Sequence, residues 1–228
     1  IPPGGTGACL VRRNVDGRLH TLNYGLVTAM AVDPVEKKPL YHWYPGSPIF
    51  SISTMGCNFK CPWCQNWTIS QRGPDEVASE DVEPEEVVRM AKSYGAPSIA
   101  YTYNEPVIWF EFVLDTMKAA RREGIRNVLV TNGYIEEEPL REMLPYLDAA
   151  NVDVKSFREE VYARYVGGSL GPVLRALEIE AEGLADLYRS AHESLSSWVG
   201  RGRGRRGEAV PPRPTESLKC DRGSDPPC

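Results

Sequence analysis

Three cysteines in one short segment are the residues of this chain best suited to chemistry. Cys57, Cys61 and Cys64 follow the pattern Cys-x3-Cys-x2-Cys. Three close thiolates suit a cubane iron–sulfur cluster, because three irons take one cysteine each and the fourth iron is left without a protein ligand. A catalytic metal site keeps such an open position for its substrate, whereas a structural site closes all four positions. We therefore predict a [4Fe–4S] cluster held by these three cysteines.

A structural zinc site is the alternative interpretation of the same segment. Zinc would need a fourth ligand from elsewhere in the chain, and Cys9, His20 and His42 are the candidates. Zinc modules usually pair one Cys-x2-Cys with a second such pair or with two histidines, and this sequence has no second pair. The cluster is therefore the favoured hypothesis.

The segments around the cysteines have the pattern of βα units, in which short apolar runs alternate with longer helical periods. Strands are predicted at 49–54, 98–103, 127–131 and 150–155. Helices are predicted at 84–94, 107–123 and 136–147, and a fourth runs through Val161 and Tyr165 toward Ala181. This order predicts an α/β fold, a partial (β/α) TIM-like barrel of parallel strands. The cysteine loop then lies at the C-terminal mouth, where such barrels build their active sites.

The two ends of the chain differ from this pattern. Residues 1–47 are rich in Gly and Pro, and their β-like stretches, Leu19–Tyr24 and Leu26–Val32, predict a β-hairpin. After about residue 183 an Arg/Gly run and a Pro-rich segment predict a disordered tail. We expect an N-terminal β-rich extension (1–47), an incomplete barrel truncated after four βα units (48–182) and an aberrant tail (183–228). A frameshifted reading frame beyond about residue 180 is the hypothesis that explains the tail.

Composition narrows the classes of partner. The net charge of −5 gives no basic field for nucleic acid or for an anionic membrane. The N-terminal residues lack the basic and apolar regions of a signal peptide, and no apolar run is long enough to span a membrane. We expect a cytoplasmic protein with no nucleic-acid or membrane partner.

The cysteine segment resembles the cluster motif of the radical S-adenosylmethionine (SAM) superfamily, Cys-x3-Cys-x-aromatic-Cys, with Trp63 as the aromatic residue. More narrowly, Asn23-Tyr24-Gly25, the run from Asp33 to His42 and the cysteine segment through Trp67 resemble AmmeMemoRadiSam-type radical SAM proteins. These are similar to pyruvate formate-lyase activating enzymes. The resemblance covers roughly residues 3–182 and does not extend beyond about residue 180.

The resemblance also implies a SAM site at the end of the second predicted strand. Tyr103-Asn104-Glu105-Pro106 stands where the superfamily has a Gly-Gly-Glu-Pro-like motif that binds the SAM amino group. Glu105 and Pro106 match, whereas Tyr103 and Asn104 replace the two glycines. The resemblance implies SAM contacts from Tyr103, Asn104 and Glu105. The alternative for Glu105 is a solvated carboxylate at the start of a helix.

Two further motifs end the third and fourth predicted strands. Thr131-Asn132-Gly133 resembles the Thr-Asn-Gly of activating enzymes, and a simple turn is its alternative. Asp153-Val154-Lys155 resembles their Asp-x-Lys motif. Strand alternation puts Asp153 and Lys155 on one face, and an interior charged pair is costly without a function. The resemblance implies SAM contacts from Thr131, Asn132, Asp153 and Lys155 and a catalytic role for Asp153 and Lys155; a structural ion pair is the alternative.

The activity implied by the resemblance is that of a radical SAM oxidoreductase similar to pyruvate formate-lyase activating enzyme. A [4Fe–4S] cluster and SAM are its cofactors, and a 5′-deoxyadenosyl radical takes hydrogen from a protein or small-molecule target. An electron donor such as flavodoxin or ferredoxin and a protein substrate are the expected partners. The alternatives are a cluster-binding protein without turnover and a zinc-binding structural module. The motifs concern the cofactors and leave the target open.

Overall fold

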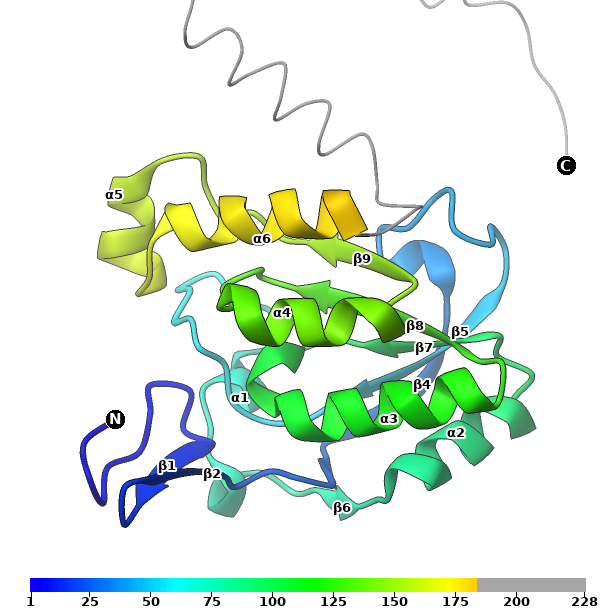
Figure 1. The fold of residues 1–228 in the computed structure, drawn as a ribbon, viewed down its shortest axis with the longest axis horizontal. Helices are drawn as coiled ribbons and strands as arrows, with labels where there is room; N and C mark the ends of the chain where they lie inside the picture. The colour runs from blue at the N-terminus through cyan, green and yellow to red at the C-terminus, as the bar shows by residue number, and fades with distance from the viewer. Residues whose placement is uncertain (184–228) are drawn as a thin grey trace, which may run out of the picture. The chain divides into compact units, whose positions relative to one another are not determined.

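The computed structural model describes residues 1–183, which are built around a five-stranded sheet (Figure 1). The sheet order is β4-β5-β7-β8-β9, with parallel pairing throughout except between β4 and β5, which are antiparallel. The strands are β4 (Ala29–Pro34), β5 (Pro48–Ser53), β7 (Ser98–Tyr101), β8 (Arg126–Thr131) and β9 (Ala149–Val152). The four parallel strands are the four that the apolar runs predicted.

The helices that follow the four parallel strands lie on one side of the sheet in Figure 1. They are α2 (Pro84–Ser93), α3 (Phe110–Arg122, preceded by η3, Pro106–Trp109), α4 (Glu137–Met143, followed by η4, Leu144–Tyr146) and α6 (Leu170–Gly183). Sequential strands that are neighbours, with all crossover helices on one side, form an arc of a barrel and not a doubly wound sheet. The partial TIM-like barrel is therefore confirmed.

The two faces of the sheet bury different residues. Phe50, Ile52 and Tyr101 belong to the large core cluster that also contains residues of α2 and α3. Ile49, Ala100, Val128 and Ala149 point to the other face, as strand alternation requires, and pack with Val35, Leu40 and Trp43. The segment after β4 therefore covers the inner face of the arc at one end of the strands and leaves the other end to the site.

The N-terminal hairpin forms one step earlier in the chain than the predicted one. β1 (Arg12–Val15) pairs with β2 (Arg18–Thr21), whereas β3 (Leu26–Val27) pairs with β6 (Glu80–Asp81) and β4 joins the main sheet. The prediction that Leu19–Tyr24 pairs with Leu26–Val32 is therefore wrong. The turn is Asp16-Gly17, where both residues have positive φ, and Asp-Gly is a strong signal for a two-residue hairpin turn.

The fourth helix is two elements and not one. A short segment, α5 (Glu159–Val161) followed by the π-helical turn η5 (Tyr162–Val166), ends at Gly167 in the left-handed conformation, and α6 follows. Glycine is the residue that adopts this conformation at least cost, so Gly167-Gly168 separates the two helices. The single predicted helix through Val161 and Tyr165 is wrong on this point.

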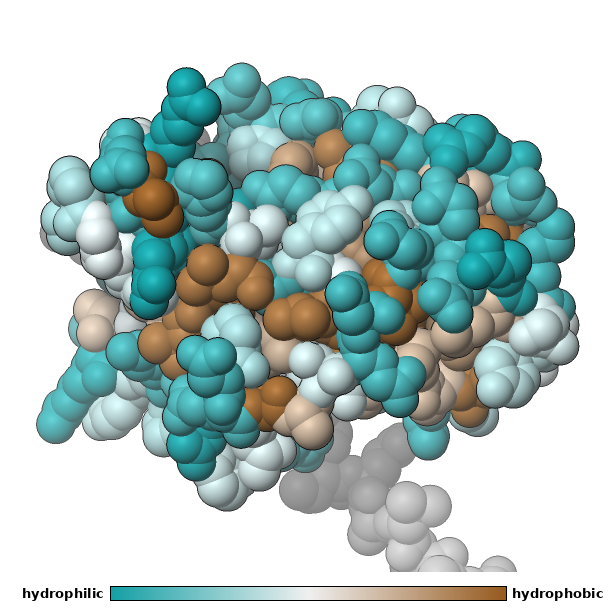
Figure 2. All heavy atoms as spheres, turned by 90° about the horizontal axis from the view of Figure 1, so that it is seen from below, coloured by the Kyte–Doolittle hydropathy of each residue, from teal (hydrophilic) through white to brown (hydrophobic). Residues whose placement is uncertain are grey.

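Short elements complete the part of the chain that the structure describes: η1 (Val35–Lys37), α1 (Trp67–Ser70) and η2 (Pro74–Glu76). On the face shown in Figure 2, hydrophilic side chains surround a band of hydrophobic ones. No helix within residues 1–183 is long and apolar enough to cross a membrane. The predicted tail, except for Gly183, lies outside the described residues.

Candidate functional site

Every predicted site residue lines one cavity of about 700 Å³ at the carboxyl ends of the parallel strands. These residues follow different strands, and the parallel pairing brings the ends of those strands to one edge of the sheet. The predicted residues in its wall are Cys57, Cys61, Cys64, Tyr103, Asn104, Glu105, Thr131, Asn132, Asp153 and Lys155. The motifs were found separately in the sequence, and the fold brings them together.

The cysteine loop leaves β5 through a turn that requires glycine. Gly56 has a φ of +85°, and a Cβ there would lie 2.4 Å from the carbonyl oxygen of Cys9. Asn104 fixes this turn from the neighbouring strand end, since its Nδ2 donates to the Gly56 oxygen (2.9 Å) and its Oδ1 accepts from the Thr54 amide (3.3 Å). Asn104 therefore links the start of the cysteine loop to the segment that follows β7.

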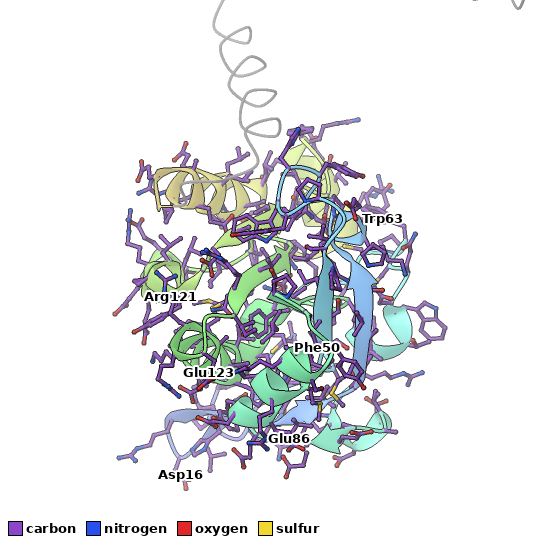
Figure 3. All side chains as sticks on the ribbon, turned by 90° about the vertical axis from the view of Figure 1, so that its right-hand side faces the viewer. Asp16, Phe50, Trp63, Glu86, Arg121 and Glu123 are labelled. Carbon is purple, nitrogen blue, oxygen red and sulfur yellow. The ribbon has the colours of Figure 1, made fainter. Side chains whose placement is uncertain are left out.

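The far part of the loop is anchored by Phe59, which is buried against Tyr134 and Tyr162. Gln71 Nε2 donates to the Phe59 oxygen (2.9 Å), and the next amide, Lys60 N, donates to the Val166 oxygen (2.8 Å). Trp63, the aromatic residue of the motif, is 51% exposed and lies at the periphery in Figure 3. The loop is fixed at both ends, with its cysteines between the fixed points.

The three thiols fit a [4Fe–4S] cluster. Cys57, Cys61 and Cys64 are free and partly exposed to the cavity. Among residues 1–183, no three His, Cys, Asp or Glu side chains converge on one ion position. Three partly exposed thiols in one cavity wall are the donor set that three irons of such a cluster take, one thiolate each. Burial raises the pKa of Cys57 to about 12, so loading a cluster must displace a proton from this thiol.

Glu105 is the centre of the hydrogen bonding between β7 and β8. Its side chain is 2% exposed. Oε1 accepts from Thr131 Oγ1 (2.6 Å) and from the Val107 amide (3.1 Å), and Oε2 accepts from the Asn132 amide (2.7 Å). Burial raises its pKa to about 7, although these bonds and the charge of Lys155 oppose the shift. Glu105 does begin a helix, η3, but it is not the solvated carboxylate of the alternative interpretation.

Asn132 connects this carboxylate to the cysteine loop. Its backbone amide donates to Glu105, while its side-chain Nδ2 donates to Asn58 Oδ1 (2.8 Å) and lies 3.9 Å from the Cys57 sulfur. Gly133 follows with a φ of +69°, and a Cβ there would lie 2.8 Å from Val152. The segment is a turn, as the alternative had it, but the turn also orients an amide toward the cluster motif.

Asp153 and Lys155 lie just beyond the end of β9, which stops at Val152, so the predicted strand is too long. Both line the cavity, whereas Val152 and Val154 pack with the hydrophobic side chains around Phe59, in agreement with the predicted alternation. Lys155 Nζ lies 3.1 Å from Asp153 Oδ2, and the Asp153 side chain is 49% exposed. Burial lowers the pKa of Lys155, but the acidic groups around it, Asp153 first and then Cys61 and Glu105, outweigh burial, and the pKa of Lys155 is raised.

Asp33, Lys37 and Lys38 also line the cavity, and none of them was a predicted site residue. Asp33 accepts from Lys38 Nζ (2.7 Å), Lys37 Nζ (3.1 Å) and the Tyr103 hydroxyl (2.5 Å). Burial raises the pKa of Asp33, but these donors outweigh burial and hold the pKa well below its usual range. Two lysines four and five residues after an aspartate were the available signal.

Comparison with known proteins gives the family. The model described as "Radical SAM superfamily" matches residues 51–184, more than half of the chain. An uncharacterized protein of Methanocaldococcus jannaschii is 46% identical over 179 residues, which are 78% of this chain and 53% of that protein. Pyruvate formate-lyase 1-activating enzyme of Escherichia coli K12 is 30% identical over 118 residues, 50% of this chain and 48% of that enzyme.

The chain spans about half the length of these curated relatives. Among solved structures, QueE from Escherichia coli superposes with a TM-score of 0.48 at 15% identity, covering 77% of this chain and 76% of QueE. Members of the matched superfamily use a [4Fe–4S] cluster and SAM, the cofactors that the cysteine motif predicted. The family match is the finding that decides the assignment, and by it the chain belongs to the radical SAM superfamily.

Proposed function

We propose that this chain binds a [4Fe–4S] cluster through Cys57, Cys61 and Cys64 and binds SAM in the same cavity. The observation that supports this most is that motif residues following four different strands line one cavity of about 700 Å³. When bound, the reduced cluster supplies one electron to SAM, which divides into methionine and a 5′-deoxyadenosyl radical able to take a hydrogen atom. The protein's part is binding, orientation and exclusion of water.

Glu105 is the proposed acceptor for the SAM amino group. A carboxylate offers about four acceptor positions, and three protein donors use three of them, which leaves capacity on the cavity side. Those bonds also fix its orientation, so it needs no reorganisation on binding. Thr131 and Asn132 hold Glu105, and Asn104 joins it to the cysteine turn.

Asp153 and Lys155 are the proposed polar groups on the β9 side of the cavity. Their 3.1 Å ion pair leaves Asp153 half exposed, so at least one carboxylate oxygen can accept from a bound hydroxyl or ammonium group. Lys155 keeps its positive charge near the partly buried Cys61, and that charge opposes the rise that burial causes in the pKa of the Cys61 thiol. That charge favours electron transfer into a cluster at this position.

The proposed reaction is hydrogen abstraction from a protein or small-molecule target, with an electron donor such as flavodoxin or ferredoxin. Similar proteins include the activating enzymes of pyruvate formate-lyase and of (2S)-3-sulfopropanediol dehydratase, the second 30% identical over 95 residues. Activating enzymes act on a partner protein, which favours a protein target.

The test is anaerobic reconstitution of the full chain with iron and sulfide, followed by reduction with dithionite in the presence of SAM. We expect a brown protein, an electron paramagnetic resonance signal of a reduced [4Fe–4S] cluster, and 5′-deoxyadenosine. Cys61→Ala should lose all three. Cys9→Ala is the matched control, because Cys9 is buried in the large core cluster and does not line the cavity.

The outcomes separate the competing functions. A brown protein that makes no 5′-deoxyadenosine would be a cluster-binding protein without turnover. A colourless chain that takes up zinc would contradict the cluster itself. Equal loss in Cys61→Ala and Cys9→Ala would indicate general damage to the fold.

A further inference from the structure

Tyr103 holds a backbone conformation that ordinarily belongs to glycine. Its φ is +69°, in the left-handed region, where a bulky side chain is rare and strained. The superfamily motif that Tyr103-Asn104-Glu105-Pro106 resembles has glycine at this position. The chain therefore keeps a strained residue in the wall of its cavity, and some contact must hold it there.

The contacts that hold Tyr103 come from outside its own loop. Its hydroxyl donates to Asp33 Oδ2 (2.5 Å), and Lys38 Nζ lies 4.5 Å from the centre of its ring. Its carbonyl oxygen accepts from Asn66 Nδ2 (2.6 Å), in the segment that follows Cys64. The side chain and the carbonyl of Tyr103 are thus fixed independently.

The acidic and basic partners are themselves buried. Lys38 is 2% exposed and Asp33 is also buried, and their side chains are 2.7 Å apart. A buried ion pair is expensive to form and gives little net stability, so its placement calls for a reason other than stability. Here the pair faces the ring and the hydroxyl of one strained residue.

The residues next to Tyr103 are the ones that the proposed function uses. Asn104 bonds both the Thr54 amide and the Gly56 oxygen, and Glu105 carries the three hydrogen bonds described above. A change in the Tyr103 backbone would therefore move the carboxylate and the start of the cysteine loop together.

We propose that Asp33 and Lys38 are positioning residues for the 103–105 loop. They hold Tyr103 in the left-handed conformation, and so give the loop the shape that a glycine would adopt unaided. This inference rests on the proposed function where it concerns SAM, because the loop's purpose is then to present Glu105. In this chain a clamp from the end of β4 (Asp33) and the segment after it (Lys38) takes the place of a glycine.

The experiment compares Tyr103→Phe with Tyr103→Gly. Phe keeps the ring and the strain but loses the bond to Asp33, and it leaves the Asp33–Lys38 pair intact, so the fold is retained. Gly removes the clamp and the strain together. SAM affinity of the reconstituted chain should fall roughly tenfold in Tyr103→Phe, the loss expected for one hydrogen bond to a charged group. Tyr103→Gly should bind SAM more tightly than Tyr103→Phe.

Tyr101→Phe is the matched control. It also deletes a buried tyrosine hydroxyl, bonded to Asn127 Oδ1 (3.0 Å), but from a side chain in the core and not in the cavity wall. It should leave SAM affinity unchanged. Affinity that falls steadily from Tyr to Phe to Gly would make Tyr103 a ligand contact and overturn the inference.

A second measurement tests the clamp without any cofactor. In the chain without a cluster, amide hydrogen exchange of a peptide covering residues 102–105 should be faster in Tyr103→Phe than in the wild type or in Tyr101→Phe. Equal exchange in all three would overturn the inference. If the wild-type chain binds no SAM, the proposed function fails, and this exchange result still decides whether the clamp exists.

Discussion

Two glutamates are almost equally buried, and their surroundings differ completely. Glu105, after β7, is 2% exposed, and Glu180, in α6, is 1% exposed. Burial is the largest cause of both pKa shifts. These shifts raise the pKa of Glu105 to about 7 and the pKa of Glu180 to about 8. Glu105 accepts three hydrogen bonds, whereas Oε2 of Glu180 has no hydrogen-bond partner within the part of the chain that the structure describes.

Burial by itself therefore does not identify a site residue. Burial alone makes a carboxyl group hard to ionise. At Glu180 burial and, after it, the charge of Glu105 raise the pKa, and no described residue donates a hydrogen bond to Oε2. At Glu105 three donors, one from η3 and two from the end of β8, oppose the effect of burial on the pKa and fix the direction of both oxygens. A carboxylate that is fixed can bind a ligand without reorganising, whereas an unpartnered one only lowers stability.

The largest expected effect is the pH dependence of the unfolding free energy, which both glutamates create. Each has a folded pKa above its unfolded value of 4.5, so the folded state holds protons that the unfolded state has released. The contribution of these two groups to stability is therefore full below about pH 4.5 and is lost as pH rises through 7 and 8. We expect a loss on the order of 5 kcal/mol between pH 5 and pH 8. Urea denaturation across this range measures it, and a flat profile would contradict both shifts.

Truncating each glutamate to alanine should change the free energy of unfolding by different amounts. Glu105→Ala leaves the Thr131 hydroxyl and the Val107 and Asn132 amides without their acceptor, so unfolding should cost roughly 3–5 kcal/mol less than in the wild type. Glu180→Ala creates a similar cavity but leaves no donor within residues 1–183 without its acceptor, so its loss should be clearly smaller. Urea denaturation at pH 7 gives both values. Equal losses would mean that the hydrogen bonds of Glu105 contribute nothing.

Replacing the unpartnered acid by a residue of similar size should stabilise the protein. Glu180→Leu removes a buried carboxyl and adds apolar surface to α6, which packs against α4. We expect a gain of roughly 1–3 kcal/mol at pH 8, and less at pH 6, where Glu180 is protonated. Thermal unfolding at the two pH values tests this. A loss of stability at pH 8 would show that Glu180 has a function that its contacts do not reveal.

Much of the site could be predicted because its signals are local. The spacing of Cys57, Cys61 and Cys64 and the motifs that end β7 and β8 are read within a few residues each. One general rule, that parallel strands end at the same edge, then brings them together. The motif residues do line one cavity, and no contact between distant segments had to be known to expect this.

The parts that could not be predicted depend on contacts between distant segments. The Asp33–Tyr103 bond joins residues 70 positions apart, and no pattern in either segment announces it. The same holds for β4. Alternation of apolar residues predicts a strand there, but it does not predict that this strand pairs with β5. Glu180 was missed because a glutamate in a predicted helix is ordinarily solvent-exposed. Asp16-Gly17 is different, since its turn signal was present and was overlooked.

The smallest effect tests whether the two glutamates influence each other. After burial, the charge of Glu105 is the second cause that raises the pKa of Glu180. Glu105→Gln removes that charge at similar size, so the pKa of Glu180 should move down toward its ordinary value, by less than burial moves it up. Carbon-13 NMR titration of labelled glutamate measures the shift. Glu178→Gln is the control, because this exposed neighbour in α6 pairs with Arg175, so its charge is neutralised and screened by solvent. An unchanged titration in Glu105→Gln, or an equal shift in both variants, would mean that the raised pKa of Glu180 comes from burial alone and that the two sites are electrostatically independent.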